Sequence, residues 1–174
     1  MFLEIAKKRE RTNHTGTLSQ FSGDCGWMEI RIIFAGKPSL TYAKVGVEEY
    51  IKRLGRHGKY KLIIVKAGES KAVSERLLQA SDGCYRIALD ERGETPSTRA
   101  FSLKLEQIEM KGAGKTVAFL IGASDGHTQE LRDKAEMVLS LSSMTMQHEL
   151  ALVVLLEQLY RVACMRSGSP YHRD

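Results

Sequence analysis

Three consecutive residues near the end of the chain carry side chains that could act on a nucleic acid. Tyr171 offers a ring that can stack, His172 an imidazole that titrates near neutral pH, and Arg173 a guanidinium that binds phosphate. Together they suit contact with an unstacked base and its backbone. A solvated polar tail, the ordinary state of a chain end, is the competing interpretation, and the pattern alone leaves both open.

A second set of chemistry-bearing residues lies in segments rich in small, hydroxyl and thioether side chains. Gly122 and Gly126 would let the backbone approach a ligand closely. Hydroxyl groups alternate with apolar side chains that could hold a purine ring in the loop formed by Leu141, Ser142, Ser143, Met144, Thr145 and Met146. This composition suits a nucleoside. The sequence has no GxGxxG motif and no P-loop, so nothing specifies a dinucleotide or a triphosphate.

Alternating strands and helices must position these segments. Apolar runs and helical spacing predict strands at 29–35, 60–67, 85–89, 116–121 and 137–141, and helices at 42–56, 70–80 (capped by Ser70), 97–110, 128–136 and 149–166. Such alternation is typical of an α/β domain with a mostly parallel sheet and helices on both faces. Ligands of open α/β sheets bind beyond the carboxyl ends of the strands. We therefore expect the loops 89–93, 122–126 and 141–148 to meet there.

The predicted helix 149–166 has apolar residues in nearly every direction around its axis. One face of a sheet cannot cover all of them, so a second protein surface must. A symmetric dimer interface is the favoured explanation. A central core helix within one chain is the alternative.

Composition limits the classes of protein that the chain can form. It has 174 residues, 43% hydrophobic and 27% charged, with 26 Lys and Arg against 21 Asp and Glu. These values describe one moderately basic folded domain and exclude a large multidomain enzyme. The apolar run 150–156 is far shorter than the ~20 residues that span a membrane. Cys25, Cys84 and Cys164 are widely spaced without a CxxC, which argues against disulfides and a zinc site and favours the reducing cytoplasm.

The amino-terminal residues 1–27 differ from the rest of the chain. They combine a Lys and Arg cluster with a stretch rich in Gly, Ser and Thr, and they lack any core-forming period. We expect a disordered extension, or a protein whose translation begins at Met28. The folded domain is expected to comprise residues 28–174, with no metal site and no catalytic triad in a recognisable arrangement.

Four motifs follow one another in a specific order along this domain. They lie at 118–126, 139–145, 156–161 (Leu-Glu-Gln-Leu-Tyr-Arg) and 170–174 (Pro-Tyr-His-Arg-Asp). In this order they resemble the ribosomal RNA large subunit methyltransferase H family, the small SPOUT-class methyltransferases. The resemblance covers nearly all of residues 28–174. It implies an α/β fold with a carboxyl-terminal trefoil knot, a homodimer, and S-adenosylmethionine bound by the knot loops.

The resemblance also implies roles for individual residues. The cofactor would be bound by Leu89, Gly122, Leu141, Ser142, Ser143, Met144, Thr145 and Met146. Tyr171 and Arg173 would contact RNA, and His172 is our candidate for the catalytic base, since it is the group in these motifs that titrates near neutral pH. Two positions depart from the usual family pattern: Ala123 replaces a second glycine, and Gln147 replaces a proline at the start of the last helix.

The activity expected from this resemblance is methylation of N3 of a pseudouridine in large-subunit (23S) rRNA, with the assembled ribosome as substrate. A non-catalytic ribosome-binding or RNA-binding protein that retains the SPOUT fold is the alternative. Cofactor binding separates the two.

Overall fold

The computed structural model describes residues 28–112, 116–122 and 124–171. The strands are β1 (Glu29–Ala35), β2 (Tyr60–Val65), β3 (Tyr85–Glu94), β4 (Thr116–Ile121) and β5 (Met137–Leu139). The helices are α1 (Thr41–Leu54), α2 (Ser70–Ala80), α3 (Thr98–Met110), α4 (Gln129–Asp133) and α5 (His148–Arg166). The predicted extension 1–27 and the site residues His172 and Arg173 lie outside the described residues. Within the described ranges, no helix is both long and apolar enough to cross a membrane.

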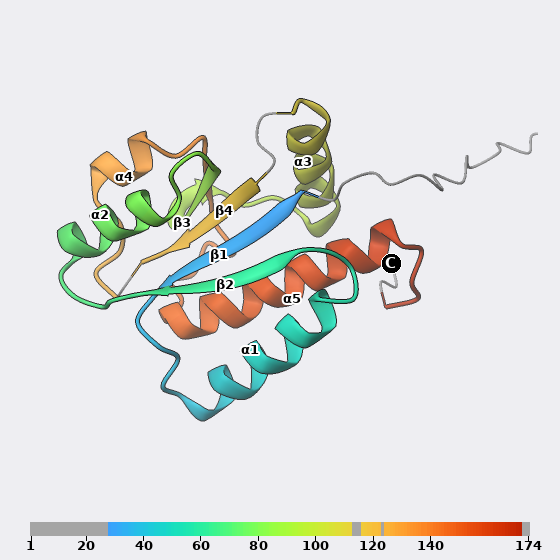
Figure 1. Ribbon diagram of the computed structural model, residues 1–174, viewed down its shortest axis with the longest axis horizontal. Coiled ribbons are helices and arrows are strands. Elements are labelled where there is room, and N and C mark those ends of the chain that lie inside the picture. Colours follow the sequence, from blue (N-terminus) through green and yellow to red (C-terminus); the bar gives the residue numbers. More distant parts are fainter. Residues whose placement is uncertain (1–27, 113–115, 123, 172–174) are drawn as a thin grey trace, which may run out of the picture.

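The strands form one sheet in the order β2-β1-β4-β3-β5, and each pair of neighbours is parallel. Helices α1, α3 and α5 cover one face, and α2 and α4 cover the other (Figure 1). Strand β1 shows why both faces need cover, because Ile32 and Phe34 are buried on the first face and Ile33 and Ala35 on the second. The predicted parallel α/β architecture is confirmed.

Helix α5 lies between the sheet and α1 (Figure 1). Leu152, Leu155 and Leu156 are fully buried within the single chain. Gly46 of α1 permits the close approach, since a Cβ there would lie 2.9 Å from Cγ1 of Val153. One chain thus covers much of the apolar surface of α5, as the core-helix alternative requires. Leu150 remains 40% exposed, so the dimer interface stays a prediction.

Several element boundaries differ from the sequence-based prediction, and two of these differences and one predicted cap have a clear physical reason. Strand β3 continues beyond Leu89 to Glu94 through a register shift, and Gly93 makes this possible because its backbone lies against that of Val138. Helix α4 ends at Asp133, not 136, because the chain turns into β5. The predicted cap at Ser70 is wrong: Glu69 is the N-cap of α2, and the Ser70 hydroxyl donates to the Gly126 carbonyl at 2.9 Å.

Candidate functional site

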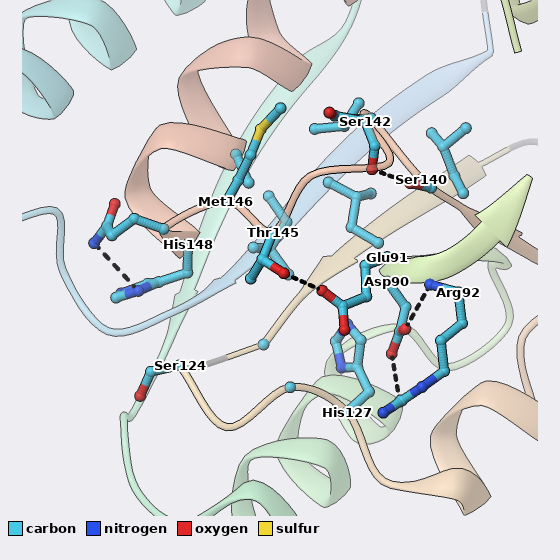
Figure 2. Close-up of a pocket in the computed structure, with 18 of the residues that line it drawn as sticks. Asp90, Glu91, Arg92, Ser124, His127, Ser140, Ser142, Thr145, Met146 and His148 are labelled. Carbon is cyan, nitrogen blue, oxygen red and sulfur yellow. Dashed lines mark hydrogen bonds and ion pairs between the residues drawn. The ribbon is translucent and has the colours of Figure 1, made fainter. Parts of the chain in front are cut away.

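A cavity of about 470 Å³ opens at the carboxyl ends of the central strands (Figure 2). Its walls are three segments, 89–92 after the main part of β3, 121–127 after β4, and 139–148 between β5 and α5, with Ala151 of α5 beside them. These are the segments that the sequence places beyond the strands. The volume lies within the range of small-molecule sites.

The structure brings most of the predicted cofactor residues together. Those that line the cavity are Leu89, Gly122, Leu141, Ser142, Met144, Thr145 and Met146. Ser143 belongs to the same loop but is exposed and is not part of the lining. Met144 is 77% exposed at the cavity, so its thioether side chain is available to cover a ligand.

The hydroxyl groups of the loop 140–145 also hold the loop itself. The Ser140 hydroxyl donates to the Ser142 carbonyl at 2.7 Å, and the backbone N–H of Met144 donates to the Ser142 hydroxyl at 3.0 Å. Thr145 donates to the Glu91 carboxylate at 2.6 Å, which links this loop to the segment after Leu89 (Figure 2). The serines therefore shape the cavity wall as well as offering polar groups to a ligand.

An ion pair fixes the second wall to the end of β3. Arg132 donates to Asp90 at 3.1 Å and to the His127 carbonyl at 2.6 Å, and Arg92 lies 3.7 Å from the same Asp90 carboxylate. The Asp90 and Arg132 side chains are only 5% and 15% exposed. Charge-assisted bonds in such a shielded place are strong and directional. Together they hold the segment 124–128 against residues 90–92 of β3.

His127 forms the floor of the cavity below Gly122. Its Nε2 lies 3.2 Å from the Leu120 carbonyl, so the neutral ring carries its proton on Nε2. Burial lowers the pKa of His127 below 6.5, while the hydrogen bond to Leu120 opposes the shift. A Cβ at Gly122 would lie 3.1 Å from both Cε1 and Nδ1 of this ring, so glycine keeps the backbone open there. Among the described residues, the buried Nδ1 of His127 has no hydrogen-bond partner.

The third wall is anchored where α5 begins. Glu149, 4% exposed, accepts hydrogen bonds from the backbone N–H groups of Ser39 and Leu40 at 2.9 and 3.0 Å and from the Ser39 hydroxyl at 2.7 Å. The preceding His148 stacks on Phe34 with ring centroids 5.5 Å apart. These contacts fasten the cavity loop to the segment that follows β1.

Gln147, where the sequence resemblance leads us to expect a proline, makes hydrogen bonds at the start of α5. Its side-chain oxygen accepts from the Leu150 N–H at 2.9 Å and from the Tyr42 hydroxyl at 3.0 Å. It is therefore the N-cap of α5 and does not loosen the start of that helix.

Tyr171 does not join the cavity of its own chain. Its ring packs on Tyr160 with centroids 4.8 Å apart, and the Arg161 guanidinium lies 5.1 Å from its centroid. Burial raises the pKa of Tyr171 to about 12. The cavity lies at the amino-terminal end of the 19-residue helix α5, whereas the Tyr171 side chain lies against residues 157–161 in the carboxyl-terminal half of that helix. At 1.5 Å per residue, the nine residue steps from His148 to Glu157 span about 14 Å along α5.

Sequence reasoning assigned no role to Asp90, Glu91, His127 and Glu149. Only the polar run 90–92 directly after a buried strand gave a signal. The partners of the others lie far away in the sequence, so no local pattern marks them. Within the described ranges, no group of three or more His, Cys, Asp and Glu residues could hold a metal ion.

Comparison with known proteins identifies the class to which this fold and cavity belong. The family model described as "Predicted SPOUT methyltransferase" matches residues 28–172. The chain therefore belongs to the SPOUT methyltransferase family.

Similar proteins narrow the relationship further. A protein from Thermus thermophilus is 44% identical over 146 residues, covering 84% of this chain and 99% of that protein. A Deinococcus radiodurans protein is 41% identical with the same coverage. Both are named "Ribosomal RNA large subunit methyltransferase H", and the resemblance found in the sequence is confirmed.

Solved structures agree on the fold alone. A probable methyltransferase from Bordetella pertussis matches with a TM-score of 0.53 at 16% identity, covering 78% of this chain and 96% of that one. A putative methylase family protein from Neisseria gonorrhoeae matches with the same TM-score and identity, covering 88% and 89%.

Proposed function

We propose that this enzyme transfers the methyl group of S-adenosylmethionine to N3 of a pseudouridine in large-subunit rRNA, acting on the assembled ribosome in the cytoplasm. The main support is the cavity formed by three loops at the carboxyl ends of parallel strands, which gathers nearly all of the residues that the family resemblance assigns to the cofactor. The names of the similar proteins support the choice of ribosomal RNA.

The residues of the cavity fit this cofactor. Leu89, Leu141 and Met146 offer apolar surface for the adenine ring, and Gly122 leaves its backbone open to close approach. Glu91 places a carboxylate at the cavity, which suits a ligand with positive charge. When bound, the cofactor supplies an activated methyl group. The loops must then hold it in line with the acceptor nitrogen and exclude water.

The acceptor nitrogen carries a proton that must leave as the new N–C bond forms. We propose His172 as the base that takes it, Tyr171 as a surface on which a base stacks, and Arg173 as a phosphate contact. Because Tyr171 follows the far end of α5, the tail of one protomer would serve the cavity of a partner. A homodimer through the outer face of α1 and α5, where Tyr42, Val45 and Leu150 are exposed, would bring the two together.

Methylation of ribosomes tests the activity. Purified enzyme with S-adenosylmethionine should add one methyl group to a pseudouridine of 23S rRNA from cells that lack this gene, detected by mass spectrometry of the nucleosides. Unmodified rRNA would contradict the proposal. Calorimetry then addresses the alternative, because a non-catalytic binder of the same fold would show no affinity for the cofactor.

Mixing two defective variants tests whether the tail acts across a dimer. Gly122→Val should lack a usable cavity, and a chain truncated after Pro170 should lack the tail. Each should be inactive alone. In a mixed dimer the intact cavity of one chain meets the intact tail of the other, so activity should return. If light scattering shows mixed dimers and they remain inactive, the tail does not act in trans.

The domain boundary and the knot are part of the same proposal. The family match begins at residue 28, which supports a self-sufficient domain at 28–174. A chain that starts at Met28 should melt and methylate like the full chain, and a lower melting temperature would contradict this. The family resemblance also implies a carboxyl-terminal trefoil knot, which is part of this proposal.

A further inference from the structure

Three carboxylates line the cavity, and their surroundings differ. Asp90 is 5% exposed and is paired with both Arg132 and Arg92. Glu91 is exposed, and the group that hydrogen-bonds to it is the uncharged hydroxyl of Thr145. In the part of the chain that the structure describes, Glu91 forms no ion pair. Its negative charge is therefore available to a ligand, whereas that of Asp90 is already neutralised.

The position of Glu91 is also fixed. It lies on the segment after Leu89, and its hydrogen bond of 2.6 Å reaches Thr145 on the opposite loop (Figure 2). This contact joins two walls of the cavity and holds the carboxylate between them. A ligand seated between these two loops thus meets the unpaired carboxylate of Glu91 at a defined place.

The chemistry of the proposed reaction gives such a charge a purpose. During methyl transfer the S–C bond breaks, its electron pair stays on sulfur, and the methyl group bonds to the acceptor nitrogen as that nitrogen loses its proton. The sulfonium cation becomes a neutral thioether. The spent product, S-adenosylhomocysteine, differs from the methyl donor by one positive charge and one methyl group, so a nearby carboxylate can distinguish them.

We propose that Glu91 is a specificity-determining residue that favours the charged methyl donor over its neutral product and so promotes product release. This inference rests on the proposed function. Asp125 provides the matched comparison, because it is also an exposed carboxylate of the lining but belongs to the loop after β4 and has its hydroxyl neighbour, Ser124, at 3.4 Å on the same loop.

Calorimetry with the full chain tests the proposal through binding alone. Glu91→Gln keeps a side-chain oxygen to accept from Thr145 but removes the charge. We expect this substitution to weaken binding of S-adenosylmethionine about fivefold to tenfold, because one attraction to a cation is lost in a partly solvated site. Binding of S-adenosylhomocysteine, which lacks that positive charge, should weaken less than about twofold. Sinefungin, which carries an ammonium group in place of the sulfonium, should follow the methyl donor. Glu91→Asp should restore most of the preference.

Other outcomes overturn the inference. Equal weakening of donor and product by Glu91→Gln would make Glu91 a structural part of the wall, and unchanged affinities would remove it from the site. A similar change of preference in Asp125→Asn would assign the effect to the general field of the cavity. Failure of the wild-type protein to bind either ligand would overturn the proposed function itself. Circular dichroism verifies that each variant is folded.

Discussion

The two ends of α5 are built on different principles. At the cavity end, the contacts join residues far apart in the sequence: 42 positions separate Asp90 from Arg132, and 110 separate Ser39 from Glu149. At the tail end, Tyr171 contacts α5 itself, and its hydrogen-bond partner Glu157 is only 14 positions away. The cavity thus depends on contacts between distant parts of the chain, whereas the tail rests mainly on α5, with Tyr50 of α1 beside Tyr171. Changes at the cavity end should lower both the stability of the protein and its affinity for the cofactor. Changes at the tail should lower methylation while stability and cofactor affinity change little.

The largest effect is expected at Gly93, where β3 returns to β5. A Cβ there would lie 2.6 Å from the carbonyl carbon and oxygen of Val138, and backbone atoms cannot move aside as a flexible side chain can. Gly93→Ala should lower the free energy of unfolding by at least about 3 kcal/mol and abolish cofactor binding. Chemical denaturation and calorimetry measure both. Gly55→Ala is the control, since the nearest atom would lie 3.5 Å away; equal stability of the two variants would contradict the expectation.

The ion pair of Arg132 should give the next largest effect. Arg132→Met leaves the shielded Asp90 carboxylate with Arg92 alone and removes a donor to the His127 carbonyl. We expect a loss of about 2 kcal/mol, less than the roughly 3–5 kcal/mol for a fully buried pair, and weaker cofactor binding. Thermal denaturation tests this against Lys134→Met, which breaks an exposed pair with Glu130 and should change little. If Arg132→Met changed neither the free energy of unfolding nor cofactor binding, the two walls would be held without this ion pair.

Glu149 should have a smaller effect that depends on pH. Burial alone would raise the pKa of its carboxyl, but the hydrogen bonds from Ser39 and Leu40 and the proximity of His148 bring it below 4.5. Because the folded pKa is lowered, the charge of Glu149 stabilises the fold above about pH 4.5, and this contribution is lost as the pH falls through the folded value. Glu149→Gln should cost about 1.5 kcal/mol at pH 7. Denaturation curves should show a smaller difference from the wild type at pH 3.5, and a constant difference would refute the assignment.

Tyr171 should have the smallest effect on stability. Tyr171→Ala removes a half-buried ring from Tyr160 and Arg161 and should cost about 1 kcal/mol, because one aromatic contact at a surface is lost. Cofactor affinity should stay within about twofold of the wild type, while methylation of ribosomes falls sharply. Tyr171→Phe, which keeps the ring, should retain most of the activity. A large loss of cofactor affinity in Tyr171→Ala would contradict the expectation that the tail does not contribute to cofactor binding.

Elements with a clear period could be predicted from the sequence, and polar connections could not. Strands β1 and β4 and helix α2 have the predicted bounds, because the strands are short apolar runs and the apolar residues of α2 recur at helical spacing. The polar run after Leu89 carries no such period, so the continuation of β3 to Glu94 depends on Gly93 meeting β5. Serine is a residue type that often caps helices, which is why Ser70 is a reasonable cap prediction. Its hydroxyl instead donates to the Gly126 carbonyl, 56 positions away, which no local rule could anticipate.

The sequence by itself determined the layers of the fold and the edge of the sheet at which its loops meet, because short apolar runs and helical spacing are local properties of the chain. The four ordered motifs also determined the family. Only the tertiary structure decided which polar groups are paired within the protein and which can meet a ligand. Asp90 is neutralised by Arg132, His127 lies beneath Gly122, and Glu91 accepts a hydrogen bond from Thr145. It also placed the Tyr171 side chain against the carboxyl-terminal half of α5, away from the cavity. These outcomes depend on charges, cavities and distances that arise only when segments tens of residues apart are brought into contact.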